Sequence, residues 1–409
     1  MPPSLFGKQS SFRHRAELAA FGLILICAAV VPLPAALISV ATFLLLLTWL
    51  LAGQLPRRCA VMWDHPQGRI ALLLLAWMAI SIAWSPAILR KAVDNWWHFR
   101  ELILFPLMLS LVAAAPEKWG RRIFAAFLVG FGISLVTSYL RWFGVLPLYN
   151  QVGEFAGFGG HTGFSLMLAY VAYACIWLWR SEPRLRPLWL VLGLLCLHNL
   201  YFFNTGRTGQ VAFLALIPLI VYRWLGRPGL LVGILAAAAL PFALYFASAT
   251  VHQRVDTAAG QIAKFRAGDT TSSDGLRLEF WQNSVTLIKR HPIFGGGSGS
   301  FDAEYKPLAA SQGLDHDHLA DNPHNEYLLM WAQYGVVGLG LFLWLWLSQW
   351  RWACRMPETQ RYLIHGLVLA MAAGDCFNSL ILDNMEGHFY VLISVALTGG
   401  WSIRNQRYG

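Results

Sequence analysis

The chain has 409 residues, of which 57% are hydrophobic and 13% are charged, and its formal net charge is +10. A soluble protein carries about 25% charged residues, so this composition excludes an ordinary soluble domain. The 19 Trp and 25 Phe residues would also be excessive for a single soluble core. The composition instead indicates a helical protein that crosses a membrane several times.

Twelve apolar runs are long enough to be transmembrane helices, since the bilayer core requires about 20 apolar residues. We expect the first helix to be retained, not cleaved as a secretory signal, because its apolar run is long and a second run follows almost at once. The predicted fold class is therefore an all-α polytopic membrane protein with about 12 transmembrane helices. These spans are 17–33, 35–53, 69–85, 101–115, 121–143, 161–180, 186–203, 208–225, 229–248, 326–349, 360–380 and 385–403.

The basic residues are distributed unevenly between the two sides of these spans. Of the 31 Lys and Arg residues, 19 fall on the side that holds the N-terminus. Cytoplasmic loops carry an excess of Lys and Arg, so the alternation predicts that both termini are cytoplasmic. The same rule accounts for most of the net charge, which is therefore no sign of nucleic-acid binding. The short outer loops keep five basic residues, which are Arg90, Lys91, Arg100, Arg141 and Arg207.

One connection, 249–325, is far longer than the others and precedes the tenth predicted span. Within it, 251–268 and 274–290 have the spacing of apolar and polar residues that is typical of helices. We expect a folded, partly helical periplasmic cap there. The chain then divides into nine transmembrane helices (1–248), the periplasmic loop or cap, and three further helices with a short cytoplasmic tail (326–409).

His324 stands at the start of the tenth span, in the stretch Asp-Asn-Pro-His-Asn-Glu-Tyr. We expect Asn322 to cap this helix, Pro323 to occupy its first position and His324 to lie in its first turn. The positive end of the helix dipole disfavours an imidazolium there, so His324 would stay neutral, as a general base must. The alternative is an interface histidine that caps or packs locally.

Several outer-side arginines could bind an anion. Arg207 lies in a short turn and must face water, an anion or a carboxylate, and its flanking glycines would let a ligand approach the backbone. Arg277 and Trp281 lie one turn apart on a predicted loop helix, which suits a phosphate with a sugar or lipid. Arg100 and Arg141 stand beside aromatic residues, and at least one is expected to be a membrane anchor. Each arginine has an alternative interpretation as an interface or surface residue.

Other patterns are less specific. The run Gly-Gly-Gly-Ser-Gly-Ser at 295–300 does not match a phosphate-binding loop, and a flexible bend is expected. Asp-His-Asp-His at 315–318 matches no standard zinc site, so no metal site is predicted. Asp375, Asp383 and Glu386 are expected at the outer end of the last two spans, in a structural role. The six cysteines lie outside the long loop and include no Cys-x-x-Cys pair, so they predict no disulfide framework.

Three segments, taken in order, resemble the bacterial O-antigen ligase family (WaaL type). They are NTGRTGQ around Arg207, RLEFWQNSVTLIKRHPIFGGGSGSF beginning at Arg277, and PHNEYLLMWAQYGVVGLGLF around His324. The ordered set, on a chain with one long loop before its tenth span, is more specific than any one of the three. The same superfamily holds O-antigen polymerases and protein O-oligosaccharyltransferases.

The resemblance implies a GT-C-like glycosyltransferase of the bacterial inner membrane that uses no cofactor, no metal and no nucleotide sugar. Its donor would be O-antigen polysaccharide on undecaprenyl pyrophosphate, and its acceptor a sugar hydroxyl of lipid A-core at the periplasmic face. It further implies that His324 is the general base and that Arg207 and Arg277 bind the pyrophosphate. Supporting residues in the matching segments are Trp281, Asn325 and Tyr327, whereas Arg100 and Arg141 have no equally clear match.

Three alternatives stay open. A polymerase would use a second undecaprenyl-linked chain as acceptor, and a protein O-oligosaccharyltransferase would use a Ser or Thr side chain. Protein-directed members are usually longer at the C-terminus, which favours the ligase. A flippase or transporter of a lipid-linked glycan would show inverted repeats and ionisable residues near the middle of the membrane. Here the charges concentrate on one face and no repeat is evident.

Overall fold

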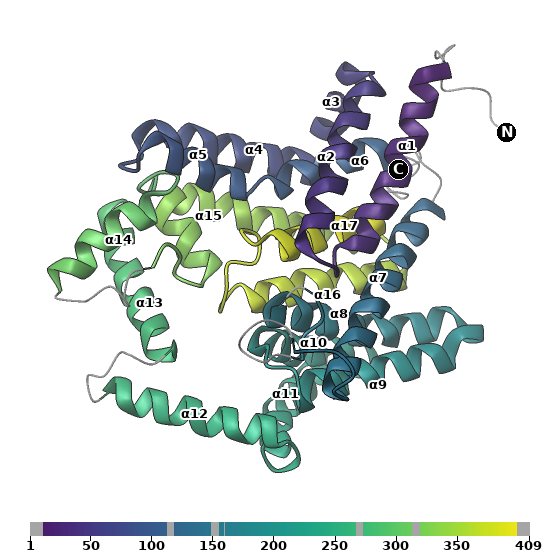
Figure 1. Cartoon of the computed structure of the whole chain (residues 1–409), viewed down its shortest axis with the longest axis vertical. Coiled ribbons are helices and arrows are strands. Elements are labelled where there is room, and N and C mark those ends of the chain that lie inside the picture. Colours follow the sequence, from purple (N-terminus) through teal and green to yellow (C-terminus); the bar gives the residue numbers. More distant parts are fainter. Residues whose placement is uncertain are drawn as a thin grey trace.

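The computed structural model describes residues 11–112, 118–148, 155–158, 160–266, 273–312 and 320–398. Within these ranges the chain forms α-helices, two short 3-10 helices and turns, and no strand. Figure 1 shows most of the helices gathered in a bundle, with α12 to α14 following one edge of it. The all-α fold predicted from the sequence is confirmed.

The part of the chain before the long loop contains eleven α-helices and the two 3-10 helices, named η1 and η2. They are α1 (Ser11–Val30), α2 (Ala35–Leu51), α3 (Leu55–Asp64), α4 (Pro66–Ile80), η1 (Ser81–Trp84), α5 (Leu89–His98), α6 (Glu101–Val112), α7 (Lys118–Trp142), α8 (Gly160–Ser181), η2 (Pro183–Leu185), α9 (Arg186–Phe202), α10 (Arg207–Leu225) and α11 (Arg227–Ala247).

The long loop and the C-terminal part contain six more helices. They are α12 (Ala249–Arg266), α13 (Ser273–Arg290), α14 (Ser300–Ser311), α15 (Glu326–Ala353), α16 (Glu358–Gly374) and α17 (Asn384–Thr398). The first two agree closely with the helices predicted at 251–268 and 274–290. The three helices α3, α5 and α14 were not predicted from the sequence.

Within the described residues, a helix lies in each of the twelve ranges that the sequence predicts as spans; the ends of two of them, 113–115 and 399–403, lie outside those residues. Seven described segments are both long and apolar enough to cross a membrane, or up to eight if α2 and α3, which meet at 117°, form one broken span. The polytopic character is therefore confirmed, and the count of twelve stays a prediction. The outermost candidate is α11, with 6% of its apolar window buried inside the protein, against 83% for α8. An apolar helix with so little protein contact is expected to face lipid.

The helix that follows the long loop, α15, is broken in its third turn. Gly335 adopts φ 67° and ψ −173°, which interrupts the helical hydrogen bonds between Glu326 and Ala353. Such a break leaves backbone groups that cost several kcal/mol each if they meet no partner in the bilayer. The sequence gives no sign of it, since the run reads as one continuous apolar span.

The glycine-rich turn of the long loop supplies the missing partners. Gly296 and Gly297 donate their N–H groups to the carbonyls of Ala332 and Gln333 at 2.9 and 2.8 Å, and Val336 N–H donates to Pro292 at 3.0 Å. The turn is thus a fixed, hydrogen-bonded structure and not the flexible bend expected from its composition. It joins the long loop firmly to the broken helix.

The same turn is held on its other side by the segment after α4. Ser298 N–H donates to Ser81 Oγ at 3.1 Å, and Ser85 Oγ donates to the Ser298 carbonyl at 2.7 Å. Gly299 N–H donates to Asn95 Oδ1 at 3.1 Å, which ties the turn to α5. Three elements far apart in the sequence therefore meet at residues 295–299.

Candidate active site

A polar cavity of about 650 Å³ lies between α5, α14 and the turns that precede α15 and α17. Its wall carries both acidic and basic side chains and several amides, and it includes four of the residues singled out from the sequence, which are Arg100, Asn322, His324 and Asp383. The lining residues are Lys91, Asp94, Asn95, His98, Arg100, Gly299, Phe301, Asp302, Asp321, Asn322, His324, Gln333, Leu382, Asp383 and Asn384.

The turn before α15 differs from the prediction. The N-cap of α15 is Asn325, whose side chain accepts a hydrogen bond from Leu328 N–H at 3.0 Å, and the helix begins at Glu326. The expected cap, Asn322, instead accepts from His324 N–H and from Ser379 Oγ, each at 2.8 Å. Asn322 therefore shapes the turn, and His324 precedes the helix instead of lying in its first turn.

The backbone of His324 is strained. Its φ is +52°, in the left-handed region that a non-glycine residue rarely adopts. Such a conformation costs about 1–3 kcal/mol and persists only where the surroundings enforce it. Here the enforcing contacts are the Asn322 side chain and Trp281, whose indole N–H donates to the Pro323 carbonyl at 3.1 Å. Strain of this kind is concentrated at functional sites.

The surroundings of His324 favour its neutral form. His324 is an exposed residue that lines the polar cavity, and the surrounding protein partly desolvates its ring. This desolvation lowers the pKa of His324 below its ordinary value, and the nearby Arg277 guanidinium lowers it further. Asp321 acts in the opposite direction, and its effect is smaller. Burial and the nearby guanidinium thus favour the neutral form of His324, an effect that was expected to come from the helix dipole.

Arg277 lies near His324 in the structure, as the pKa effect shows, although the two residues are far apart in the sequence. It is half-buried on α13, one turn before Trp281. Because Trp281 bonds to the turn of His324, α13 holds its arginine and the histidine in a fixed relation. A cation and a neutral imidazole therefore meet at one end of the loop helix.

Arg207 is the first residue of α10, and its helix is linked to the turn of His324 through the segment after α16. Asn378 Nδ2 donates to Thr208 Oγ1 at 2.6 Å, and the adjacent Ser379 hydroxyl donates to Asn322. Neither Arg207 nor Arg277 belongs to the described wall of the polar cavity. The structure thus links the helices of both arginines to the histidine turn by hydrogen bonds, and it places neither arginine in the described wall of the cavity.

The glycines beside Arg207 have a different role from the one expected. A Cβ on Gly206 would lie 2.3 Å from the His161 carbonyl oxygen, and one on Gly209 would lie 2.1 Å from that of Ser165. The space beside the backbone is filled by α8, so these glycines allow two helices to pack closely. The expectation that they admit a ligand to the backbone is wrong.

Arg100 and Arg141 have separate places. Arg100 lines the polar cavity together with His324. Arg141 donates hydrogen bonds to the backbone carbonyls of Pro147, Ala156 and Gly157, and its guanidinium lies over the ring of Phe158 at 5.6 Å. These contacts fasten the connection between α7 and α8.

The two supporting residues that follow His324 tie α15 to the end of α16. Asn325 Nδ2 donates to the Cys376 carbonyl at 3.0 Å, and the Tyr327 hydroxyl donates to the Ala372 carbonyl at 2.8 Å. The motif His-Asn-x-Tyr therefore combines one cavity residue with two residues that fix its position relative to a neighbouring helix.

The contribution of α5 to the wall of the polar cavity was not predicted from the sequence. Lys91, Asp94, Asn95 and His98 all line the polar cavity. Their spacing of three and four residues is that of one helix face, and this was the signal that could have revealed them. On another face of the helix, Leu89, Val93 and Trp97 are exposed and apolar.

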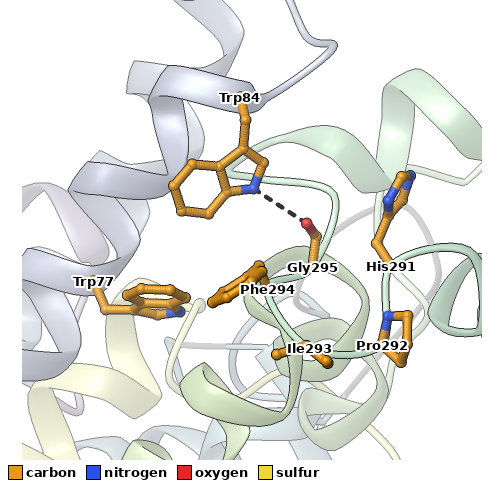
Figure 2. A pocket seen from close by; sticks show the side chains of 7 residues that line it. All are labelled: Trp77, Trp84, His291, Pro292, Ile293, Phe294 and Gly295. Atoms are coloured by element: carbon orange, nitrogen blue, oxygen red, sulfur yellow. Dashed lines mark hydrogen bonds between the residues drawn. The ribbon is translucent and has the colours of Figure 1, made fainter.

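An apolar cavity of about 580 Å³ lies on the other side of the glycine-rich turn. Figure 2 shows two indole rings, Trp77 and Trp84, facing the loop residues, with Trp84 Nε1 donating to the Gly295 carbonyl at 3.1 Å. Gly295 lines this cavity and Gly299 lines the polar one. One short turn therefore separates a space suited to hydrocarbon from a space suited to sugar or phosphate.

Within the described ranges, no group of three or more His, Cys, Asp or Glu side chains is arranged to hold a metal ion. The Asp-His-Asp-His pattern at 315–318 lies outside those ranges. The described cavity wall combines His324 and His98 with the Arg100 guanidinium, Lys91 and four aspartates.

Two comparisons with known proteins bear on the family to which the chain is similar. The family model described as O-antigen ligase matches residues 192–343, which include α10, the long loop and the first part of α15. A Haemophilus influenzae protein, described as uncharacterized, is 30% identical over 90 residues, which are 22% of this chain and 23% of that protein. The chain thus matches about a quarter of the length of this relative. Residues 192–343, a little over a third of the chain, are therefore similar to the O-antigen ligase family.

Proposed function

We propose that the protein is an O-antigen ligase, which transfers a polysaccharide from undecaprenyl pyrophosphate to a sugar hydroxyl of lipid A-core. The observation that carries the proposal is the turn of His324, in which a strained histidine opens into a polar cavity beside Arg277. A neutral base next to fixed cations suits a reaction in which a hydroxyl attacks a carbon that carries an anionic leaving group.

In the proposed reaction His324 accepts the proton of the acceptor hydroxyl while the oxygen forms a bond to the anomeric carbon. The bond from that carbon to the phosphate oxygen breaks, and undecaprenyl pyrophosphate leaves with the electron pair. Arg277 and Arg207, with Arg100 from the cavity wall, stabilise the charge on this leaving group. A single displacement inverts the anomeric configuration. The leaving group is already a good one, so no general acid is needed.

The two cavities fit the two parts of such substrates. The polar cavity has the charged and amide groups that bind sugar hydroxyls and phosphate, and the apolar cavity beside Trp77 and Trp84 offers a surface for hydrocarbon. We place the reaction at the periplasmic face of the bacterial inner membrane, with both termini in the cytoplasm. The distribution of basic residues in the sequence supports this orientation.

The test is a transfer assay with purified protein, an undecaprenyl-pyrophosphate-linked glycan, lipid A-core and excess chelator. The informative variant is His324→Asn, because asparagine tolerates the left-handed backbone conformation while it removes the imidazole. Wild-type protein is expected to move glycan to lipid A-core, and the variant to do so roughly 10²- to 10⁴-fold more slowly. Equal rates in a folded variant would remove His324 from the role of base.

The same assay separates the ligase from its alternatives. Glycan that lengthens only on its own lipid carrier would identify a polymerase. Transfer to a Ser or Thr of an added acceptor protein would identify a protein O-oligosaccharyltransferase. If a folded preparation binds the donor and transfers nothing to any acceptor, the enzyme hypothesis fails and a transporter of the lipid-linked glycan becomes the better interpretation.

A further inference from the structure

A fully enclosed carboxylate lies directly behind Arg100 in the wall of the polar cavity. Glu101 is 0% exposed, and its Oε1 atom is 3.1 Å from a terminal nitrogen of the Arg100 guanidinium, which is 23% exposed. A buried carboxylate is costly unless a cation compensates it. Arg100 is the nearest such cation, so the pair has one buried partner and one that reaches the cavity.

Glu101 is itself held from two directions by α17. His388, 1% exposed, places Nδ1 at 3.4 Å from Glu101 Oε1. A Cβ on Gly387 would lie 3.1 Å from Glu101 Cγ, so this glycine leaves only enough room for the glutamate side chain. Both contacts of α17 therefore limit the movement of the carboxylate away from Arg100.

His388 contacts the carboxylate of Glu101 and two further groups, one on its own helix and one on α2. Its Nδ1 atom lies 2.6 Å from the Asn384 carbonyl, which can only accept, so Nδ1 carries the proton. Its Nε2 atom lies 3.1 Å from Thr42 Oγ1, which can donate to it. Asn384 also lines the polar cavity, so the same histidine supports the cavity wall at a second point.

The guanidinium of Arg100 is fixed at both ends of its fork. One terminal nitrogen donates to the Trp97 carbonyl at 3.2 Å, and the other faces Glu101. A guanidinium has five N–H donors, so several are left for a ligand in the cavity. The contacts with Trp97 and Glu101 set the direction of these remaining donors, and α17 affects it through its own contacts with Glu101.

We propose that Glu101 is a positioning residue that holds Arg100 against the polar cavity for the anionic part of the lipid-linked donor, and that His388 holds Glu101 in place. The proposal rests on the proposed function, since it takes the ligand of the cavity to be the pyrophosphate-linked donor. Arg100 touches the donor, while Glu101 and His388 act through Arg100.

The kinetic test compares Glu101→Gln, Arg100→Ala and the double variant with wild type, in the transfer assay at varied donor concentration. Glu101→Gln keeps the shape of the side chain and removes its charge. It is expected to raise the donor KM roughly tenfold, the effect of one misoriented charge-assisted hydrogen bond, with little change in kcat. In the Arg100→Ala background the same change should have no further effect. A merely structural glutamate would lower activity equally in both backgrounds, and that result would overturn the proposal.

A second measurement needs no activity. Phenylglyoxal modifies guanidinium groups, and the modification of each arginine is followed by mass spectrometry in the purified protein. Arg100 is expected to react several-fold faster in Glu101→Gln than in wild type, whereas Arg141, which is held by backbone carbonyls, serves as the internal reference. Unchanged labelling of Arg100 would overturn the proposed role of Glu101, whether or not wild-type protein transfers glycan. A lack of transfer by wild-type protein would by itself refute only the proposed function.

Two further variants complete the design. Glu358→Gln removes the carboxylate of an arginine–glutamate pair with Arg223, away from the cavity, and should leave the donor KM unchanged. If Glu101→Gln does not fold, Gly387→Ala displaces the glutamate while it keeps every charged group. Gly387→Ala is then expected to raise the donor KM only while Arg100 is present, and an equal rise in the Arg100→Ala background would refute the proposed role.

Discussion

The backbones of Gly295 and Gly335 lie against each other, so that a Cβ on either glycine would come within 2.6 Å of the other's backbone nitrogen. One glycine ends the long loop's Pro-Ile-Phe-Gly turn and the other breaks α15. Both have positive φ, 74° and 67°. The two glycine-containing motifs are therefore the two halves of one contact, which fixes the loop to the helix that follows His324.

Replacing either glycine by alanine is expected to separate these halves. Gly335→Ala would bring Cβ to 2.0 Å from the Ile293 carbonyl oxygen and would force a left-handed conformation on alanine. Positive φ combined with ψ −173° is a conformation essentially restricted to glycine, which costs other residues about 1–3 kcal/mol, and the backbone overlap adds to it. We expect a lower midpoint of thermal unfolding in detergent for Gly295→Ala and Gly335→Ala, together with a loss of transfer.

Gly340→Ala is the matched control on the same helix. A Cβ at Gly340 meets nothing within 4 Å, and glycine in a helix interior is about 0.5–1 kcal/mol less stable than alanine. This variant should be as stable as wild type or slightly more so. Similar losses in all three variants would show that the contact between the two turns has no special importance.

This contact also shows what the sequence can and cannot predict. The apolar period of the run after Glu326 predicted a helix there, and the structure has one. The break at Gly335 is stabilised by carbonyl and amide groups of a loop some forty residues earlier, such as Gly296 and Pro292. A local pattern contains no information about partners that distant, so the run reads as continuous.

The site was predictable to a similar extent. The motifs drew attention to His324 and Arg277, and the structure places them together. The choice between Asn322 and Asn325 as helix cap could not be made locally, because both are good caps and each precedes a plausible helix start. It is decided by Ser379, which bonds to Asn322 from another part of the chain. The cavity face of α5 was missed because ten residues rich in charge and Trp resemble an ordinary outer loop.

Asn322 is expected to matter through the backbone that it shapes. Its side-chain oxygen accepts from His324 N–H and from the Ser379 hydroxyl. Asn322→Ala removes both bonds, each worth about 0.5–1.5 kcal/mol, and releases the left-handed turn. We expect kcat to fall while the donor KM changes little, because the base is misplaced and the cations are not.

The control is Asn322→Asp, which keeps the acceptor oxygen and so should retain the turn. It is expected to keep more of the activity than Asn322→Ala when both are assayed at a pH well above the ordinary pKa of histidine. If the two variants lose the same activity, the hydrogen bonds of the Asn322 side chain do not position His324.

Arg100 and Arg141 are expected to respond differently to removal, although the sequence places both beside aromatic residues on the outer side. Arg141 bonds to carbonyls of the connection between α7 and α8, so Arg141→Ala should lower thermal stability and leave the donor KM unchanged. Arg100 lines the polar cavity, so Arg100→Ala should raise the donor KM and change stability less. A rise in donor KM for Arg141→Ala in a folded preparation would assign it to donor binding instead.

The pH dependence of transfer should report on His324 and its two charged neighbours. A general base is inactive when protonated, so the rate falls on the acid side of its pKa. Because burial and Arg277 lower the pKa of His324, this fall should occur below the ordinary value of 6.5.

Arg277→Gln removes a charge that disfavours the imidazolium and should move the fall to higher pH. Asp321→Asn removes a charge that favours the imidazolium and should move it to lower pH. Both variants are compared with wild type as rates normalised to each protein's own maximum, so that a change in donor binding does not enter. Opposite displacements identify His324 as the titrating base, whereas displacements in the same direction, or none, assign the acid limb to another group.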